Sequence, residues 1–347
     1  MQPDFKIVAN GADVTQLLRD RLISIRVTDK AGLDSDELEI TIDDRDGAVA
    51  LPALGATLQA WLGYRETGLT QIGIYRVDEV QSAGPPQRIV VRGKPANMSG
   101  KIKQARRYAW SGVTLAQIVS DIAARNKLKP VCRVKATVAR ADQMNESDLH
   151  FLTRIAAQYD ATATVKGGQV LVLPRGGQAV SASGKRLATL VIQRQDISSW
   201  DYKSGDRQAT GGAVARHHDK NTGKTLATYI PNPDNPDAPP RVIRHPVASK
   251  GAASAKAKAA GSAAKRAEKT LLLNLPGRAD VVAERLLRTQ GIKPGVDHLW
   301  SVDAVTHDFG ASGWQTSLEL VLNKKGKTGK KGKKGKHAKP TRVLKPE

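Results

Sequence analysis

The chain has 347 residues, of which 40% are hydrophobic and only 4% aromatic, and its formal net charge at pH 7 is +22. This length is enough for two or three domains, and their cores must be mainly aliphatic. No apolar run reaches the roughly 18 residues of a membrane helix. The N-terminus "MQPDFKIVANG" lacks the basic and apolar segments of a secretory signal, and synthesis in the cytoplasm is expected.

Residues 1–100 are predicted to form an antiparallel β domain. The segments "LISIRV" (22–27) and "ELEITID" (37–43) place apolar residues at every second position, which is typical of strands with one buried face. Asn10-Gly11 is a favourable pair for a hairpin turn. Several short strands separated by turn residues predict a barrel or a sandwich.

Residues 101–180 are predicted to form a small α/β unit, because the period of the apolar residues changes there. Over 115–122 these residues recur at helical spacing. A second helix is expected to begin after Asn145, which we interpret as its N-cap. Its predicted apolar stripe consists of Leu149, Leu152, Ala156 and Tyr159, flanked by Ile155. A hairpin that turns at Gly167-Gly168 is expected to follow.

Residues 181–322 are predicted to return to β-structure and to end in a hairpin. The Pro-rich stretch 231–240 has five prolines in ten residues and is expected to be an irregular loop. The Ala/Lys-rich segment 249–270 fits either a solvent-exposed helix or a linker, since two glycines weaken a helix. The last segment, 323–347, holds ten lysines and a net charge of about +10, which predicts a disordered basic tail.

Glu146, Ser147, Asp148 and His150 place two acids, a serine and a histidine close together in the sequence and are a candidate catalytic cluster. The start of a helix explains them, because acids are favoured in a first turn, and His150 falls off the apolar stripe, near Arg154. A hydrolytic triad needs a serine on a sharp elbow with a histidine within reach, and no G-x-S-x-G motif occurs. We therefore assign no catalytic residue.

Three further motifs are assigned ordinary structural roles. His217-His218-Asp219 is not expected to bind a metal, because neighbours on a strand point to opposite faces and no further ligands are evident. "NTGKT" (221–225) resembles the end of a phosphate loop but lacks the upstream glycine, the preceding strand and the following helix. His298 and His307 lie in or near strands with no partner pattern. The single cysteine, Cys132, provides neither a disulfide nor a metal cluster, and no cofactor is expected.

The lysine-rich tail is a candidate contact for a polyanion such as nucleic acid. Lys330, Lys331, Lys333 and Lys334 form its densest part, and such clusters bind polyanions by releasing counterions. The tail has no aromatic residue for base stacking, so binding would not depend on sequence. The alternative is a solubilising or packing tail.

A family resemblance emerges from longer segments. "NESDLHFLTRIAAQYDATATVKGGQVLVLP" (145–174) closely resembles the signature of the phage late control protein D family, the baseplate hub proteins of contractile tails. "ELEITIDDRDG" with "LPALGATLQAWLGY" resembles the first barrel of that family, and "YAWSGVTLAQIVSDIAARNKL" resembles its first helix. "LPGRADVVAERLLRTQGIKPGVDHLWSVDAVTHDFGASGWQTSLELVL" resembles its closing strands. These segments span most of residues 1–322, and the lysine tail is outside the resemblance.

The resemblance implies an α+β, mainly β fold, with two similar antiparallel β-barrel domains (1–100 and 181–322), a small α/β insert domain (101–180) and a disordered basic tail (323–347). It also implies a likeness to the hub part of the valine–glycine-repeat spike proteins of type VI secretion. Three copies would form a pseudo-sixfold ring in the tail baseplate of the virion, as a homotrimer between the tail tube protein and a separate trimeric tail spike protein. The tape-measure protein and the baseplate wedge proteins are further candidate partners. No enzyme activity is implied.

Two alternatives from other classes stay open. A baseplate-associated cell-wall hydrolase needs a carboxylate or Cys/His site that the sequence does not display. A basic nucleic-acid-binding protein is supported only by the lysine tail.

Overall fold

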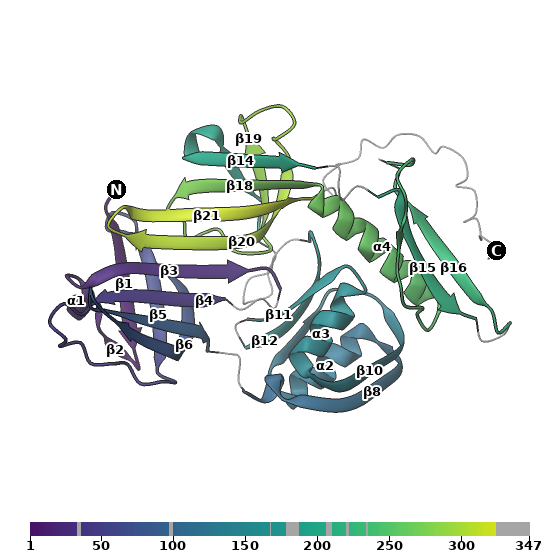
Figure 1. Cartoon of the computed structure of the whole chain (residues 1–347), viewed down its shortest axis with the longest axis horizontal. Helices are drawn as coiled ribbons and strands as arrows, with labels where there is room; N and C mark the ends of the chain where they lie inside the picture. Colours follow the sequence, from purple (N-terminus) through teal and green to yellow (C-terminus); the bar gives the residue numbers. More distant parts are fainter. Residues whose placement is uncertain are drawn as a thin grey trace. The chain divides into compact units, whose positions relative to one another are not determined.

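The computed structural model of the chain describes residues 1–32, 36–96, 100–166, 168–177, 187–205, 210–219, 222–233 and 235–323 (Figure 1). The predicted disordered tail, with Lys330, Lys331, Lys333 and Lys334, lies outside these residues. The structure is mainly β, with 52% strand and 16% helix, as predicted. None of the described helices is both long and apolar enough to cross a membrane.

The chain divides into two compact units. The first unit comprises Met1–Ser99, Leu187–Tyr202 and Leu271–Leu320. The second unit comprises Gly100–Arg186, Lys203–Thr270 and Val321–Glu347. Each unit therefore combines segments that are far apart in the sequence.

The first unit is built on one large sheet of thirteen strands. These strands are β1 (Pro3–Ala9), β2 (Ala12–Asp13), β3 (Leu22–Lys30), β4 (Glu37–Asp43), β5 (Thr57–Tyr64), β6 (Gly68–Ala83), β7 (Arg88–Pro95), β13 (Leu190–Gln193), β14 (Ser199–Ser204), β18 (Lys269–Pro276), β19 (Leu286–Gln290), β20 (Leu299–Gly310) and β21 (Gly313–Leu322). Their order is β14-β18-β21-β20-β3-β4-β7-β6-β5-β1-β2, and β13 and β19 branch from β20 (Figure 1). The short helix α1 (Thr15–Leu18) follows β2.

The predicted closure into barrels is wrong, because no sheet closes into a barrel within the described residues. β3 pairs with β4 on one side and with β20 on the other. Both edges of β3 are therefore occupied, and the predicted C-terminal hairpin, which is confirmed as β20 and β21, extends the N-terminal sheet. Strands from the two ends of the chain share one open sheet whose outermost strands are β2 and β14.

The core of the first unit follows most of the predicted alternation. All three apolar residues of β4 are buried, and Phe309 and Trp314 of the last hairpin pack against the same core. Ile23, predicted on the buried face, is 46% exposed because a bulge interrupts the pairing of β3 with β4 at this position. The predicted turn at Asn10-Gly11 is confirmed: both residues have positive φ, +49° and +87°, as a type I′ hairpin requires.

The second unit begins with the region predicted as an α/β insert. Its elements are η1 (Gly100–Lys103), β8 (Ala105–Thr114), α2 (Leu115–Arg125), β9 (Lys129–Cys132), β10 (Thr137–Ser147), α3 (Asp148–Ala157), β11 (Ala161–Lys166) and β12 (Gln169–Pro174). β10 pairs with β8, and β12 lies between β11 and β9. The helix predicted over 115–122 is confirmed as α2. The predicted hairpin is confirmed as β11 and β12, although Gly167 in its turn lies outside the described residues.

The second predicted helix begins two residues later than expected. Ser147, not Asn145, is the N-cap of α3: its Oγ accepts a hydrogen bond from the backbone N–H of His150 at 3.1 Å. Asn145 still belongs to β10, where it has a positive φ of +53° beside a shift in the β10–β8 register. The predicted stripe also missed Phe151. The buried apolar residues of α3 are Phe151, Leu152, Ile155 and Ala156.

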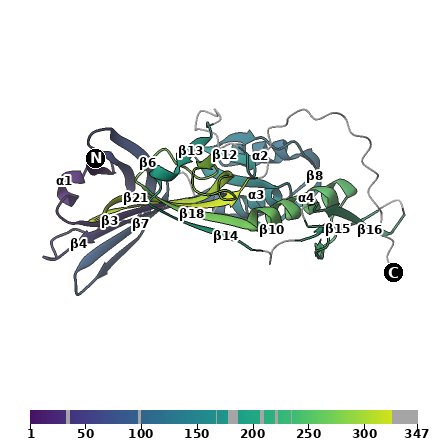
Figure 2. The ribbon, with the colours of Figure 1, turned by 90° about the horizontal axis from the view of Figure 1, so that it is seen from above.

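The remainder of the second unit is a three-stranded sheet with one long helix. Its elements are β15 (Gly212–His218), β16 (Thr225–Pro231), β17 (Arg241–Val242) and α4 (Lys250–Ala267). The Ala/Lys-rich segment is therefore a helix, and α4 runs alongside β15 in both views (Figures 1 and 2). Ala253 and Ala257 of α4 pack on Ala213 and Ala215 of β15, and all four are fully buried. Small side chains let helix and sheet approach closely, so this part of the helix needs no large apolar residue.

Candidate functional site

Glu146, Ser147, Asp148 and His150 lie where β10 meets α3. Because Ser147 Oγ accepts the backbone N–H of His150, the hydroxyl acts as a helix cap. The ring of His150 instead has its Nδ1 2.6 Å from a carboxylate oxygen of Glu146, and its side chain is 69% exposed. An activated serine needs a basic side chain within hydrogen-bond reach, and the ring of His150 interacts with Glu146 instead. The predicted role of this group as the start of a helix is confirmed.

Asp148 is fully buried at the start of α3. Its carboxylate accepts hydrogen bonds from Arg125 Nη1 at 3.1 Å, Asn126 Nδ2 at 2.8 Å and Gln143 Nε2 at 3.0 Å. Arg106 Nε lies 3.8 Å from it. A buried carboxylate is tolerated when its charge is paired and its lone pairs are satisfied. Asp148 thus connects α3 to α2, β10 and β8, which is a structural role.

Glu146 lacks the protonation behaviour of a general acid. Burial acts to raise the pKa of Glu146, but hydrogen bonds from Arg154 and His150 outweigh it and hold the pKa below its usual value. A general acid at neutral pH needs a raised pKa. Glu146 is therefore suited to anchoring Arg154 and His150 and not to donating a proton.

The histidines singled out by the sequence do not form a metal site. His217 is buried and His218 is exposed, on opposite faces of β15, as predicted. His307 of β20 is buried, with Nδ1 3.0 Å from Thr316 Oγ1. Nowhere in the described ranges do three His, Cys, Asp or Glu residues gather in a way that suits a metal ion.

Of the stretch "NTGKT", residues 222–224 lie between β15 and β16, and Thr225 is the first residue of β16. The backbone N–H of Asp219 donates to the carbonyl oxygen of Lys224 at 2.9 Å, and β15 and β16 run antiparallel on either side. A phosphate loop leads into a helix whose N-terminal N–H groups face the ligand, and a strand follows here instead. The predicted hairpin turn is confirmed, with residues 220–221 outside the described part.

An apolar groove in the first unit was missed by sequence reasoning. Its cavity of about 440 Å³ is lined by residues of β1, β4 and β5, by α1 and by the loop 44–56. Leu17 of α1 lines the groove and is 73% exposed. Leu51 and Leu54, on the same loop, are 61% and 70% exposed. Leucines that remain in water beside a groove are typical of a contact with another molecule.

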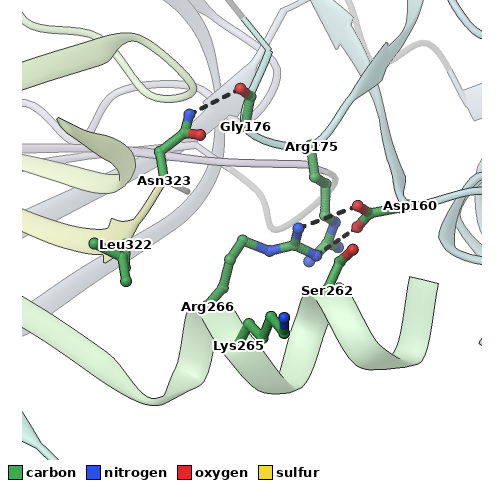
Figure 3. A pocket seen from close by; sticks show the side chains of 8 residues that line it. All are labelled: Asp160, Arg175, Gly176, Ser262, Lys265, Arg266, Leu322 and Asn323. Carbon is green, nitrogen blue, oxygen red and sulfur yellow. Dashed lines mark hydrogen bonds and ion pairs between the residues drawn. The ribbon is translucent and has the colours of Figure 1, made fainter. Parts of the chain in front are cut away.

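A charged pocket in the second unit was also missed (Figure 3). It has a volume of about 170 Å³ and is lined by α4, by Asp160, Arg175 and Gly176 at the ends of the β11–β12 hairpin, and by Leu322 and Asn323, all of which belong to the second unit. Arg266 binds Asp160 through two hydrogen bonds, Nη2 to Oδ1 at 2.5 Å and Nη1 to Oδ2 at 3.2 Å. Asn323 Nδ2 donates to the carbonyl oxygen of Gly176 at 2.8 Å. A bidentate ion pair of this kind fixes the relative orientation of the two side chains as well as pairing their charges.

Only weak signals for these two surfaces exist in the sequence. Leu51 and Leu54 stand in a short Ala/Pro/Gly-containing loop, where an apolar residue has no obvious core to enter. Lys258 and Lys265 of α4 stand seven positions apart, on one helical face, but the partner Asp160 is 106 residues away from Arg266. Neither the groove nor the pocket can be placed without the fold.

The comparisons with known proteins agree on one family. A family model described as phage tail baseplate hub (GPD) matches residues 74–313. The probable baseplate hub protein of Escherichia phage 186 is 33% identical over 363 residues, which cover 92% of this chain and 93% of that protein.

Solved structures share the fold at lower sequence identity. The 43 kDa tail protein of prophage MuSo2 from Shewanella oneidensis aligns with a TM-score of 0.71 at 13% identity, over 92% of this chain and 98% of that chain. The E. coli c3393 protein, described as a component of the type VI secretion system, aligns with a TM-score of 0.56 at 11% identity, over 88% of this chain and 74% of that chain. These likenesses concern the fold alone.

The fold is therefore that of phage tail proteins. The chain belongs to the phage tail baseplate hub (GPD) family. Its location is the tail baseplate of the virion, and the resemblance seen in the sequence is confirmed.

Proposed function

We propose that three copies of this chain form a ring in the baseplate of a contractile tail and join the tail tube to the central spike. The observation that carries the proposal is the extent of the match with a baseplate hub protein, 92% of this chain and 93% of that protein. Both β regions and the insert thus have counterparts in a hub protein. Two related β regions in each chain let a threefold assembly present six near-equivalent edges to a sixfold tube.

The proposed domain division has related β domains at 1–100 and 181–322, an insert at 101–180 and a disordered basic tail at 323–347. Its support is that the first compact unit leaves out the continuous stretch Gly100–Arg186. An insert that does not enter the sheet is free to vary without disturbing a ring built from the β domains.

The apolar groove supports a packed contact between chains. Leu17, Leu51 and Leu54 are exposed in the isolated chain, and the centres of protein interfaces are richer in apolar side chains than the surrounding surface. Burial in an assembly would remove this apolar area from water. Such a contact would be insensitive to salt, because it does not depend on charge pairs.

We also propose a structural and non-enzymatic role. The relatives carry names of structural tail proteins, and Ser147 is occupied as a helix cap. The tail spike and tail tube proteins are the proposed principal partners, with the tape-measure and wedge proteins as further ones. Lys330, Lys331, Lys333 and Lys334 remain a proposed polyanion contact. Their positions lie outside the described residues.

A particle-assembly test examines the joining role. In host cells that make every tail protein except this chain, we expect tail tubes and the spike protein to sediment separately. Supplying the chain from a plasmid is expected to restore sedimentation of the spike with the tubes. Spike protein that sediments with tubes in the absence of the chain would contradict the proposal.

A further inference from the structure

A second cavity lies next to the charged pocket along α4. That cavity, of about 490 Å³, is lined by α4 and by residues 134–136 and Tyr159 of the insert. Asp160 and Ser262 line both cavities. The two cavities therefore adjoin, and together we call them the α4 groove.

One face of α4 forms a whole wall of this groove. The lining residues recur every three or four positions from Gly251 to Arg266, which is the spacing of a single helical face. Most of them are small, such as Ser254, Ala255 and Ala259. Small side chains leave the helix backbone open to close approach by an extended chain.

The charge in the α4 groove is strongly one-sided. Its walls carry five cations, from Lys135, Arg175, Lys258, Lys265 and Arg266, against the single carboxylate of Asp160. Asp160 is already bound by Arg266. Within the described residues, the charged groups of Lys135, Arg175 and Lys258 have no hydrogen-bond or ion-pair partner. The groove is therefore complementary in charge to an anionic occupant.

We propose that the α4 groove binds an acidic, extended peptide segment of a partner protein. The pairing of Arg266 with Asp160 shows that the groove already orients one carboxylate in two-pronged fashion. Nucleic acid fits less well, because single strands are held by aromatic stacking platforms and Tyr159 is the sole aromatic residue among those that line the groove. The groove lies within one chain, so this inference does not depend on the proposed ring.

The test uses the full chain and a short fluorescein-labelled peptide of alternating glutamate and glycine. The groove variant combines Lys135→Ala, Arg175→Ala and Lys258→Ala. The control variant removes the same charge from three exposed sites of the same unit that do not line the groove. These are Lys224→Ala, Arg241→Ala and Arg244→Ala. All six side chains are exposed, so both variants are expected to fold, which equal urea midpoints verify.

Fluorescence anisotropy at low ionic strength is expected to show that the groove variant binds the peptide at least about tenfold more weakly than the wild type. The control variant is expected to lose less than about twofold. Equal losses in the two variants would overturn the inference and assign binding to general charge or to the lysine tail. Failure of the wild type to bind the peptide would also overturn it.

An oligothymidylate with the same charge as the peptide tests whether the groove prefers nucleic acid. We expect it to bind more weakly than the peptide and to be affected equally by the two variants. Tighter binding of the oligothymidylate, lost selectively in the groove variant, would replace the acidic peptide with single-stranded nucleic acid and contradict the proposal.

Discussion

Replacing Asp148 by alanine is expected to destabilise the second unit by about 3–5 kcal/mol, because it leaves a buried cationic and amide network without its carboxylate. Arg125, Asn126 and Gln143 each donate to Asp148 at 2.8–3.1 Å. The buried amides of Asn126 and Gln143 cannot regain the water that they gave up on folding, and Arg125 is only partly exposed. The helix α3 also loses the acid in its first turn.

Cys132 provides the readout for this substitution. It is the sole cysteine of the chain and lies half-buried in β9 of the same unit, so pulsed thiol labelling in increasing urea follows the opening of that unit. Asp142→Ala is the matched control, because Asp142 forms an exposed pair with Arg140, and such pairs contribute less than about 1 kcal/mol. Equal effects of the two substitutions would contradict the network assigned to Asp148.

The stability of the first unit is expected to fall between about pH 7 and pH 5 because of His307. Burial lowers the pKa of His307 to about 4 from an ordinary 6.5, although the carboxylates of Asp29, Asp308 and Asp280 act in the opposite direction. Below pH 6.5 the unfolded chain binds a proton that the folded chain does not, so acid favours unfolding. The loss amounts to about 2 kcal/mol at pH 5.

His307→Asn isolates this contribution. Asparagine keeps a polar group near Thr316 Oγ1, 3.0 Å from Nδ1 in the native chain, and has no titrating ring. Urea unfolding of both proteins, followed by tryptophan fluorescence, gives their difference in unfolding free energy at each pH. We expect the free energy of unfolding of the wild type, minus that of the variant, to fall by about 2 kcal/mol from pH 7 to pH 5. A difference that stays constant would show that the folded protein takes up this proton at the same pH as the unfolded chain, so that burial does not lower the pKa of His307.

Local patterns in the sequence predicted the elements well. The alternation in β4 and the apolar spacing of α2 both reflect contacts that each element makes through a single face, and this information is contained within a few residues. The start of α3 was predicted less well, because Asn145 and Ser147 are both good caps. A bulge in β10 beside Asn145 decides between them.

Long-range pairing was not predictable from the same patterns. β3 has one apolar face both in a closed barrel and in the observed open sheet. Its sequence therefore does not indicate whether its second edge pairs with a strand of residues 1–100 or with β20. The outcome depends on partners such as Ile25 and Phe309, which pair across 284 positions of sequence. The expectation of closed barrels was wrong for this reason.

The candidate surfaces depend on tertiary structure in the same way. The Ala/Lys-rich segment lacks large apolar residues, so its burial on β15 is visible only once Ala213 and Ala215 face it. The exposed leucines beside the apolar groove become informative only when the loop is placed over the sheet. The family resemblance, by contrast, could be recognised from the sequence because several long segments resemble those of the family in the same order.

The most direct test of the account is the native mass of the purified full chain, alone and mixed with its cognate spike protein, at low and at high salt. The account predicts a species of three chains, or a complex of three chains with three spike chains, that persists at high salt because packed apolar surfaces hold it. A chain that remains monomeric at both salt concentrations, even with the spike protein present, would contradict the ring.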